Sequence, residues 1–317
     1  MTRKYEKSFL DQRIIDRIEE KKKKIDKVRP FPKIVLQNLQ EEMIVEWTYN
    51  SNAIEGNTLS LGETRLVLEE GITIHGKPLK DHLEATNHKE ALLFLFKIIK
   101  QKNKVDEALI KKLHQIIVKN IEKEYAGKYR TGQVRILGAD FIPPNYLKIS
   151  KLINELIKWY YSKGKESYIL DQVAIFHHRF ETIHPFFDGN GRTGRLLMNV
   201  KLMEKGYPPI IVANNERKKY LNALNKANKE DYKPLVLFFA ITLEKYLDVY
   251  LRAIAKATGY QKELISLQEL SKKVPYSQEY LSLLARQGKI HALKKGKVWF
   301  SSKEDIEKYI NKRQKKR

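Results

Sequence analysis

The sequence of 317 residues contains no cysteine. This absence excludes disulfide bonds, thiolate zinc sites, iron–sulfur clusters and a cysteine nucleophile. The sequence also has no run of the roughly 20 apolar residues that a membrane-spanning helix needs. Its first residues, MTRKYEKSFLDQR, lack the apolar segment of a secretory signal. From these absences we expect a cytoplasmic protein without a membrane anchor.

Acidic side chains are scarce relative to basic ones. Lys and Arg number 61 and Asp and Glu 38, which gives a formal net charge of +23 at pH 7. With 42% hydrophobic residues the chain can bury a core, so it is not of the disordered class. The charge is densest in residues 255–317, where 16 basic side chains face 6 acidic ones, whereas residues 30–254 are typical of a lysine-rich solvated surface. This charge predicts an acidic partner, such as nucleic acid, nucleotide phosphates or an anionic surface.

Most of the chain has the periodicity of amphipathic helices, with Gly and Pro between the periodic segments. It predicts helices over residues 9–28, 33–54, 60–70, 81–102, 106–119, 150–162, 168–183, 191–205, 215–228 and 231–256. Residues 129–149 differ, because apolar and polar residues alternate there around Gly138, and because they include the pair Pro143-Pro144. This pattern predicts an exposed β-hairpin or flap.

The stretch HPFFDGNGRTGR, from His184 to Arg195, lies between two apolar helical segments. A proline and three glycines turn its backbone tightly, so its N–H groups can form an anion-binding nest at a helix N-terminus. Arg192 and Arg195 can clamp phosphate oxygens there, and a bound polyanion would relieve their conflict with the helix dipole. Asp188 offers a carboxylate suited to Mg²⁺, and His184 offers a base near neutral pH. The combination predicts phosphoryl-transfer chemistry on a nucleotide.

This stretch resembles the signature of Fic domain proteins, HPFx(D/E)GNGRxxR, and matches it at every defined position. The resemblance covers about residues 30–250 and implies a helical core that transfers AMP from ATP to a Ser, Thr or Tyr hydroxyl of a protein. It implies that His184 deprotonates the hydroxyl and that Asp188 holds Mg²⁺ on the α- and β-phosphates. It assigns to ATP and its phosphates the residues Gly189, Asn190, Gly191, Arg192 (β-phosphate side), Thr193, Gly194 and Arg195 (γ-phosphate).

Two further segments fit the resemblance. Residues 129–149 take the place of the family's flap, which docks the target peptide by strand addition; an ordinary surface hairpin is the alternative. The implied target-docking residues are Thr131, Gly132, Gln133, Val134, Arg135 and Ile136. Residues 220–224 and Asn228 resemble the family's adenine-side wall, although a core helix explains residues 220–224 nearly as well.

Upstream, the residues SNAIEGN at positions 51–57 match the family's inhibitory motif, (S/T)xxxE(G/N), with Ser51 and Glu55 at the defined positions. The location before the core is that of the class with an N-terminal inhibitory helix. A Glu55 carboxylate at Arg195 would occupy the guanidinium that holds the γ-phosphate, so ATP would bind out of line for attack. The alternative is an exposed Glu before a helix-ending glycine. In some relatives this Glu orients a water that removes AMP, so a deAMPylase is a second predicted activity.

Residues 264–310 predict a small basic module. The pattern indicates a helix at 267–272, a second helix between Ser277 and Gly288, two short strands at 290–293 and 298–300, and a last helix. This order is that of a winged helix-turn-helix and resembles excisionase/MerR-type modules. The residues predicted to contact DNA are Ser277, Gln278, Glu279, Ser282 and Arg286 in the groove, and Lys294, Lys295 and Lys297 on phosphates. Protein docking or dimerisation is the alternative role.

The sequence thus predicts a mainly α protein: an N-terminal helical region with the inhibitory motif (1–100), a Fic catalytic core with a β-hairpin flap (101–255) and a winged helix-turn-helix (256–317). The predicted function is an autoinhibited nucleotidyltransferase that uses ATP and Mg²⁺ on a target protein or on itself, with a homodimer implied by the resemblance. A DNA-binding regulator with a nucleotide-sensing core is a further alternative. A metal hydrolase using His177, His178 and His184 is disfavoured, because adjacent histidines face different sides of a helix and no acidic ligands accompany them.

Overall fold

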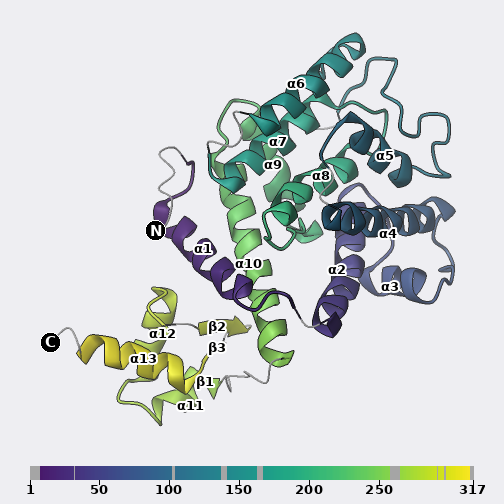
Figure 1. The fold of residues 1–317 in the computed structure, drawn as a ribbon. Helices are drawn as coiled ribbons and strands as arrows, with labels where there is room; N and C mark the ends of the chain where they lie inside the picture. Colours follow the sequence, from purple (N-terminus) through teal and green to yellow (C-terminus); the bar gives the residue numbers. More distant parts are fainter. Residues whose placement is uncertain are drawn as a thin grey trace. The chain divides into compact units, whose positions relative to one another are not determined.

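The computed structural model describes residues 8–31, 33–101, 104–136, 141–162, 167–257, 265–290, 292–295 and 298–314. The chain divides into two compact units, Met1–Arg252 and Ala253–Arg317 (Figure 1). The predicted boundary between residues 100 and 101 falls inside the first unit, so that division stays a prediction. Within the described residues, no helix combines the length and the apolar character that crossing a membrane requires.

The first unit is helical, and the helices predicted from periodicity are confirmed with ends within three residues. Apart from the 3-10 turns η1 (Tyr146–Lys148) and η3 (Asn214–Glu216), its elements are α1 (Gln12–Asp26), α2 (Lys33–Ile54), α3 (Leu61–Glu69), α4 (Leu79–Lys100), α5 (Glu107–Ile117), α6 (Ile149–Tyr161), α7 (Ile169–Ile183), α8 (Asn190–Glu204), α9 (Arg217–Ala227) and α10 (Lys233–Ala257). Local signals explain their limits. Asp11 and Asp106, for example, cap α1 and α5 by accepting hydrogen bonds from the first turn.

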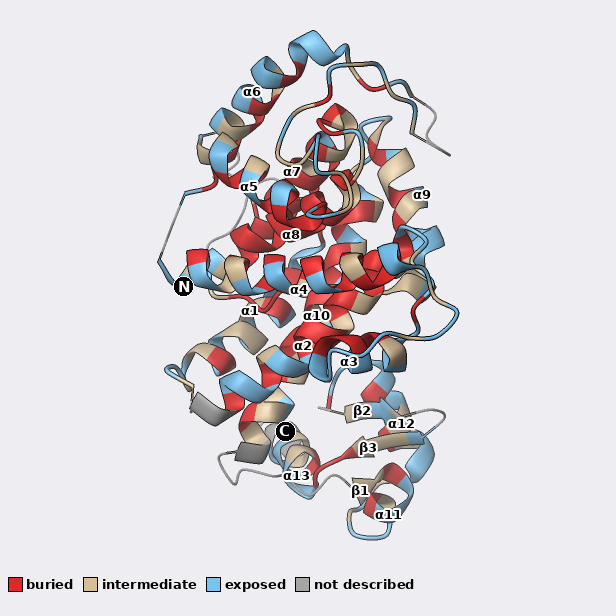
Figure 2. Cartoon of the chain, turned by 90° about the vertical axis from the view of Figure 1, so that its right-hand side faces the viewer, coloured by how far each residue is buried: buried red, intermediate tan, exposed pale blue. Residues whose placement is uncertain are grey.

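Helix α8 is buried on nearly all sides, as Figure 2 shows by its red colour. It packs against α7, α5, α4 and α2. Its two motif arginines, Arg192 and Arg195, are each only 2% exposed. A buried guanidinium must be paired to be tolerated. The surrounding helices therefore have to supply carboxylates to the centre of the unit.

The segment at residues 129–149 differs from the predicted β-hairpin, because its described residues form no strand. Pro143 and Pro144 have no N–H groups to donate to a ladder. Side chains join the two arms instead. Gln133 Nε2 donates to the carbonyl oxygen of Pro143 at 2.7 Å, and Arg130 Nη2 donates to that of Pro144 at 2.6 Å.

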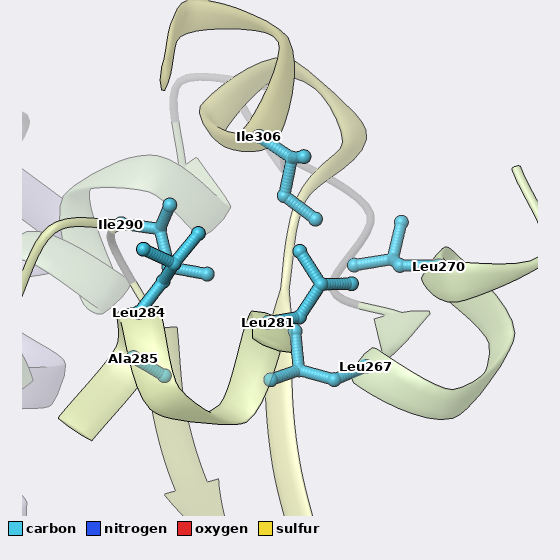
Figure 3. Close-up of a cluster of buried hydrophobic side chains, with 7 residues drawn as sticks. All are labelled: Leu267, Leu270, Leu281, Leu284, Ala285, Ile290 and Ile306. Carbon is cyan, nitrogen blue, oxygen red and sulfur yellow. The ribbon is translucent and has the colours of Figure 1, made fainter. Parts of the chain in front are cut away.

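The second unit comprises β1 (Ile265–Ser266), α11 (Leu267–Ser271), α12 (Gln278–Arg286), β2 (Ala292–Lys295), β3 (Val298–Ser301) and α13 (Lys303–Gln314). Its strands pair antiparallel in the order β1-β3-β2. It has its own apolar core, drawn in Figure 3, made by Leu267, Leu270, Leu281, Leu284, Ala285, Ile290 and Ile306. The predicted helices and the two predicted strands are present, and the two-residue β1 was not expected because it is too short to show a period. The winged-helix assignment stays a prediction.

Candidate active site

The loop between α7 and α8 reverses the chain at two left-handed positions. His184 caps the C-terminus of α7 with φ 48°, and its N–H donates to the carbonyl oxygen of Phe180 at 3.0 Å. Gly189, with φ 75°, then leads into α8 at Asn190. Positive φ is routine for glycine and strained for histidine. The geometry places His184 and Asp188 at the N-terminal end of α8.

The buried side chain of Asn190 stabilises this loop by hydrogen bonds to the loop backbone. This side chain is 2% exposed, donates to the carbonyl oxygen of Phe186 at 2.8 Å and accepts the Phe186 N–H at 2.9 Å. The structure thus directs this predicted phosphate-binding side chain to the loop backbone. His114 on α5 adds support that sequence reasoning missed: its ring stacks on Phe186, and its Nε2 donates to the carbonyl oxygen of Asp188 at 3.0 Å. No sequence pattern marks His114, because the contact joins residues far apart in the chain.

His184 is held in the form that a general base requires. Its Nδ1 donates to the carbonyl oxygen of Glu181 at 3.3 Å, which leaves the lone pair on Nε2. Burial lowers the pKa of His184 to about 4, and the charge of Arg130 acts in the same direction. The ring is therefore neutral at pH 7. Its own carbonyl oxygen accepts a hydrogen bond from Arg130 Nε at 2.8 Å, which fixes the loop against residues 129–136.

One cavity of about 400 Å³ brings predicted catalytic, phosphate-binding, inhibitory and adenine-wall residues together. Its lining includes His184, Gly191, Arg195 and Glu55, and also Tyr220, Leu221, Leu224 and Asn228 from the predicted adenine wall. Among the predicted target-docking residues 131–136, only Ile136 lines it, and Phe141 from the second arm of the predicted flap lines it as well. The adenine wall is part pocket and part core, because Ala223 is buried and Tyr220 is hydrogen-bonded to His177.

Asp188 carries the carboxylate expected to hold a metal. Burial opposes its ionisation, but the charge of Arg192 and the hydrogen bond from the Gly189 N–H outweigh it and lower the pKa of Asp188. Its side chain is 45% exposed, so an oxygen can reach a ligand. Within the described residues, no three His, Asp or Glu side chains gather as a metal-ligand cluster. One ionised carboxylate fits Mg²⁺ that takes its other ligands from nucleotide phosphates and water.

The inhibitory residues meet Arg195 at the cavity wall. Arg195 Nη2 donates to Glu55 Oε1 at 2.7 Å and to the carbonyl oxygen of Ser51 at 2.8 Å, while Nε donates to Ser51 Oγ at 3.1 Å. A Cβ atom at Gly191 would lie 2.2 Å from Glu55 Oε1, so only glycine permits this approach. The contact predicted from the sequence is therefore present, with the last turn of α2 bonded to α8.

Comparison with known proteins places this site in a family. Residues 104–202 match the model of the Fic/DOC family. The structure is similar to that of Fic-1 from C. elegans, with a TM-score of 0.69, 30% identity, and coverage of 77% of this chain and 72% of that one. The chain belongs to the Fic/DOC family.

Other Fic relatives agree. A protein adenylyltransferase Fic from Nematostella vectensis is 35% identical over 246 residues, which are 76% of this chain and 56% of the relative. A Fic domain-containing signalling protein from Bacteroides thetaiotaomicron has a TM-score of 0.70 and 27% identity, covering 76% of this chain and 97% of that one. The chain spans about half the length of the curated relatives it matches.

Of the predicted catalytic, metal and phosphate-binding residues of the Fic motif, only His184, Gly191 and Arg195 line the cavity. The predicted metal ligand Asp188 lines another pocket, together with His114 and Phe187. Arg192 pairs with Glu84 Oε1 at 2.9 Å and with Asp188 at 3.2 Å, instead of pointing freely toward a phosphate. Thr193 is fully buried, and a Cβ at Gly194 would lie 2.2 Å from Glu181 Oε1. No sequence pattern indicated Glu84 as a partner of Arg192. These positions therefore have packing and pairing partners that the motif pattern does not reveal.

The histidines of the disfavoured metal hydrolase are committed to hydrogen bonds. His177 Nε2 bonds the Tyr220 hydroxyl at 2.6 Å, and burial lowers the pKa of His177 to about 3. His178 Nε2 donates to Asn228 Oδ1 at 2.8 Å, and its Nδ1 accepts from the Tyr232 hydroxyl at 3.2 Å. The remaining nitrogen of His177, Nδ1, lies 3.9 Å from a single carboxylate oxygen, Glu181 Oε1. Since the described residues contain no group of three His, Asp or Glu side chains that could hold a metal, this alternative gains no support.

The predicted DNA-contact residues lie on the second unit. Ser277, Gln278, Glu279 and Arg286 are exposed at or on α12, as is Lys294 on β2, and Ser282 is half-buried. Ser277 Oγ also accepts the N–H of Tyr280, which caps the helix as expected. Lys297 and the side chain of Lys295 lie outside the described residues.

Proposed function

We propose that this chain is a protein adenylyltransferase, transferring AMP from ATP to a Ser, Thr or Tyr hydroxyl of a target protein or of itself. The observation that carries the proposal is that His184, Gly191 and Arg195 line one and the same cavity, with His184 in its neutral form. Curated relatives named protein adenylyltransferase Fic, 33–35% identical to this chain, support it.

In this reaction, the chain's residues position the reactants and move one proton. Nε2 of His184 accepts the proton of the target hydroxyl, whose oxygen attacks the α-phosphorus as pyrophosphate leaves. Backbone N–H groups at the start of α8, those of Asn190 and Gly191, stabilise charge on the phosphate oxygens. Asp188 would hold Mg²⁺, which when bound neutralises charge on the phosphates. Arg195 takes the γ-phosphate once its present partner has left.

We further propose that Glu55 restrains this activity. Its carboxylate occupies Arg195 at 2.7 Å, and both residues line the cavity that would receive ATP. A nucleotide bound beside this ion pair lacks the γ-phosphate contact and loses alignment with His184. Positioning supplies much of the rate enhancement in phosphoryl transfer, so the ion pair is sufficient to keep the enzyme slow.

The position of the label in ATP tests the proposed reaction. The Glu55→Gly variant of the full chain, incubated with lysate, should transfer label from ATP carrying ³²P at the α-phosphate and none from ATP carrying it at the γ-phosphate. Transfer of γ-label would indicate phosphorylation and refute the proposal. The same labelled proteins, purified and returned to wild-type chain, test the second activity: release of AMP by the wild type and not by Glu55→Gly would identify Glu55 as the residue that orients water.

The activity should be insensitive to moderate acid. A base works only when unprotonated, and burial lowers the pKa of His184 to about 4. We therefore expect the labelling rate of Glu55→Gly to stay level from pH 8 to about 5 and to fall as pH drops through the pKa of His184. Single-turnover rates with α-labelled ATP measure this profile. A midpoint near 6.5, the ordinary value for histidine, would contradict the neutral, buried base.

DNA binding by the second unit is a separate proposal, supported by the exposed face of α12 and the basic charge of residues 255–317. We expect the full chain to bind duplex DNA with an affinity that falls steeply with salt. Arg286→Glu and Lys294→Glu should each weaken binding about tenfold at low salt. Lys219→Glu, the same charge change at a 77% exposed side chain of α9, is the matched control and should have little effect. Fluorescence anisotropy measures the affinity. An equal loss of DNA affinity in all three variants would show that only the net charge matters and would contradict a DNA-binding face on the second unit.

Self-association and a cytoplasmic location stay predictions.

A further inference from the structure

One buried carboxylate joins the inhibitory segment to the catalytic loop. Glu84, on α4, is 6% exposed. Its Oε2 accepts a hydrogen bond from Asn57 Nδ2 at 2.9 Å, and its Oε1 lies 2.9 Å from Arg192 Nη1. Asn57 is two residues beyond Glu55. Glu84 therefore contacts the turn that carries the inhibitory residue and an arginine of the Fic motif.

The chain of contacts continues to Asp188. Arg192 Nη2 lies 3.2 Å from Asp188 Oδ1 and 3.3 Å from Oδ2. Charges thus alternate along Glu84, Arg192 and Asp188, with a net charge of −1. If Arg192 had Asp188 as its sole partner, the guanidinium would cancel the charge that attracts a cation. Glu84 shares the guanidinium and leaves Asp188 with negative charge to offer.

Glu84 and Glu55 differ in their exposure and in their position relative to the nucleotide cavity. Glu55 lines the nucleotide cavity and its side chain is 37% exposed, whereas the Glu84 side chain is 7% exposed and is not part of the cavity wall. The remaining basic neighbour, Lys80, lies 3.9 Å from Glu84 with its own side chain 56% exposed, so water screens that pair. Glu84 therefore pairs with Arg192 from outside the lining of the nucleotide cavity, and it does not compete with a phosphate for space in that cavity.

We propose that Glu84 is a positioning residue that holds Arg192 against Asp188. In this way it sets the affinity of the Asp188 carboxylate for the divalent cation that accompanies ATP. Through Asn57 it also links that carboxylate to the inhibitory turn. The inference rests on the proposed function in that ATP with Mg²⁺ is the ligand. It does not depend on transfer of AMP.

Asp81 provides a matched control. It is on the same helix, one turn earlier, and is also 6% exposed. Its Oδ2 accepts hydrogen bonds from the N–H and the hydroxyl of Thr58, both at 2.7 Å. Asp81→Asn therefore loosens the same turn next to Asn57 without removing a charged partner of Arg192.

The test is calorimetric titration of ATP into the full chain carrying Glu55→Gly, at a series of Mg²⁺ concentrations. Adding Glu84→Gln should raise the Mg²⁺ concentration needed for half of the maximal ATP affinity by about tenfold. ATP affinity without Mg²⁺ should stay unchanged, since the cavity wall is intact. Adding Asp81→Asn should leave the Mg²⁺ dependence at the parent value.

Two further variants separate the proposed role from general damage. Glu84→Asp keeps the charge and should restore most of the Mg²⁺ dependence. In an Arg192→Gln background, Glu84→Gln should cause no additional shift, because no guanidinium remains to be balanced. A shift no larger than that of Asp81→Asn, or one that persists without Arg192, would overturn the inference. Binding is read without turnover, so failure of Glu55→Gly to transfer AMP would refute the proposed function and leave this result standing.

Discussion

The Glu55→Gly variant should transfer AMP to protein about a hundredfold faster than the wild type, because misplacement of a reacting group by about 1 Å costs a factor of this size. Removing the carboxylate frees Arg195 Nη2, now 2.7 Å from Glu55 Oε1, for the γ-phosphate. The substitution opens no core cavity, because the Glu55 side chain is 37% exposed, and Arg195 keeps its two hydrogen bonds to Ser51. Initial rates with α-labelled ATP and wild-type or variant chain measure the effect.

Glu70→Gly is the matched control for this prediction. Glu70 also ends a helix and precedes a glycine with positive φ, Gly71, but it is exposed and lies outside the lining of the ATP cavity. It should label at the wild-type rate. Equal labelling by wild type and Glu55→Gly would refute the restraint, whatever the absolute activity.

The second large effect is expected at the base. In the Glu55→Gly background, His184→Ala should lower the single-turnover rate by a factor of about 10² to 10⁴, the range that a positioned general base contributes. ATP affinity should change little, because the proton is taken from the target hydroxyl and not from the nucleotide. Calorimetry of ATP binding and single-turnover labelling separate the two quantities.

His75→Ala, at an exposed histidine outside the cavity lining, should leave both values unchanged. A His184→Ala variant that retains the parent rate would exclude His184 as the base. In that case the proton would have to leave by another route, such as directly to solvent.

The sequence was informative where function depends on a short continuous segment. The stretch from His184 to Arg195 predicted the loop, the helix after it and the chemistry. The contact of Glu55 with Arg195 also followed from two motifs, although 140 residues separate the partners. Motifs of this kind encode a contact because the same residue types must meet for the site to work.

The sequence was uninformative where a contact depends on packing between helices. Nothing in the pattern of α4 marks Glu84 as the partner of Arg192, since its neighbours carry the charges of an ordinary solvated face. Nor could the side-chain bonds of Arg130 be predicted, because they replace the strand ladder that the alternation at residues 129–149 suggested. An alternating pattern predicts the face on which each side chain lies and does not predict backbone hydrogen bonds. Pro143 and Pro144 have no N–H groups to donate, so they cannot take part as donors in a strand ladder.

The left-handed backbone conformation at His184 lowers the thermal stability of the chain, although the proposed reaction needs the imidazole at this position. With φ 48°, its Cβ crowds the following carbonyl group, at a cost of about 1–2 kcal/mol that glycine would avoid. A protein selected for durability alone would carry glycine there. We therefore expect a His184→Gly chain to melt at a higher temperature than a His184→Ala chain. Both lack the imidazole, and the positive-φ penalty of alanine exceeds the roughly 0.5–1 kcal/mol of extra unfolded-state entropy that glycine brings. The proposed base at this position therefore lowers the stability of the fold, and a substitution that stabilises the fold here removes the base.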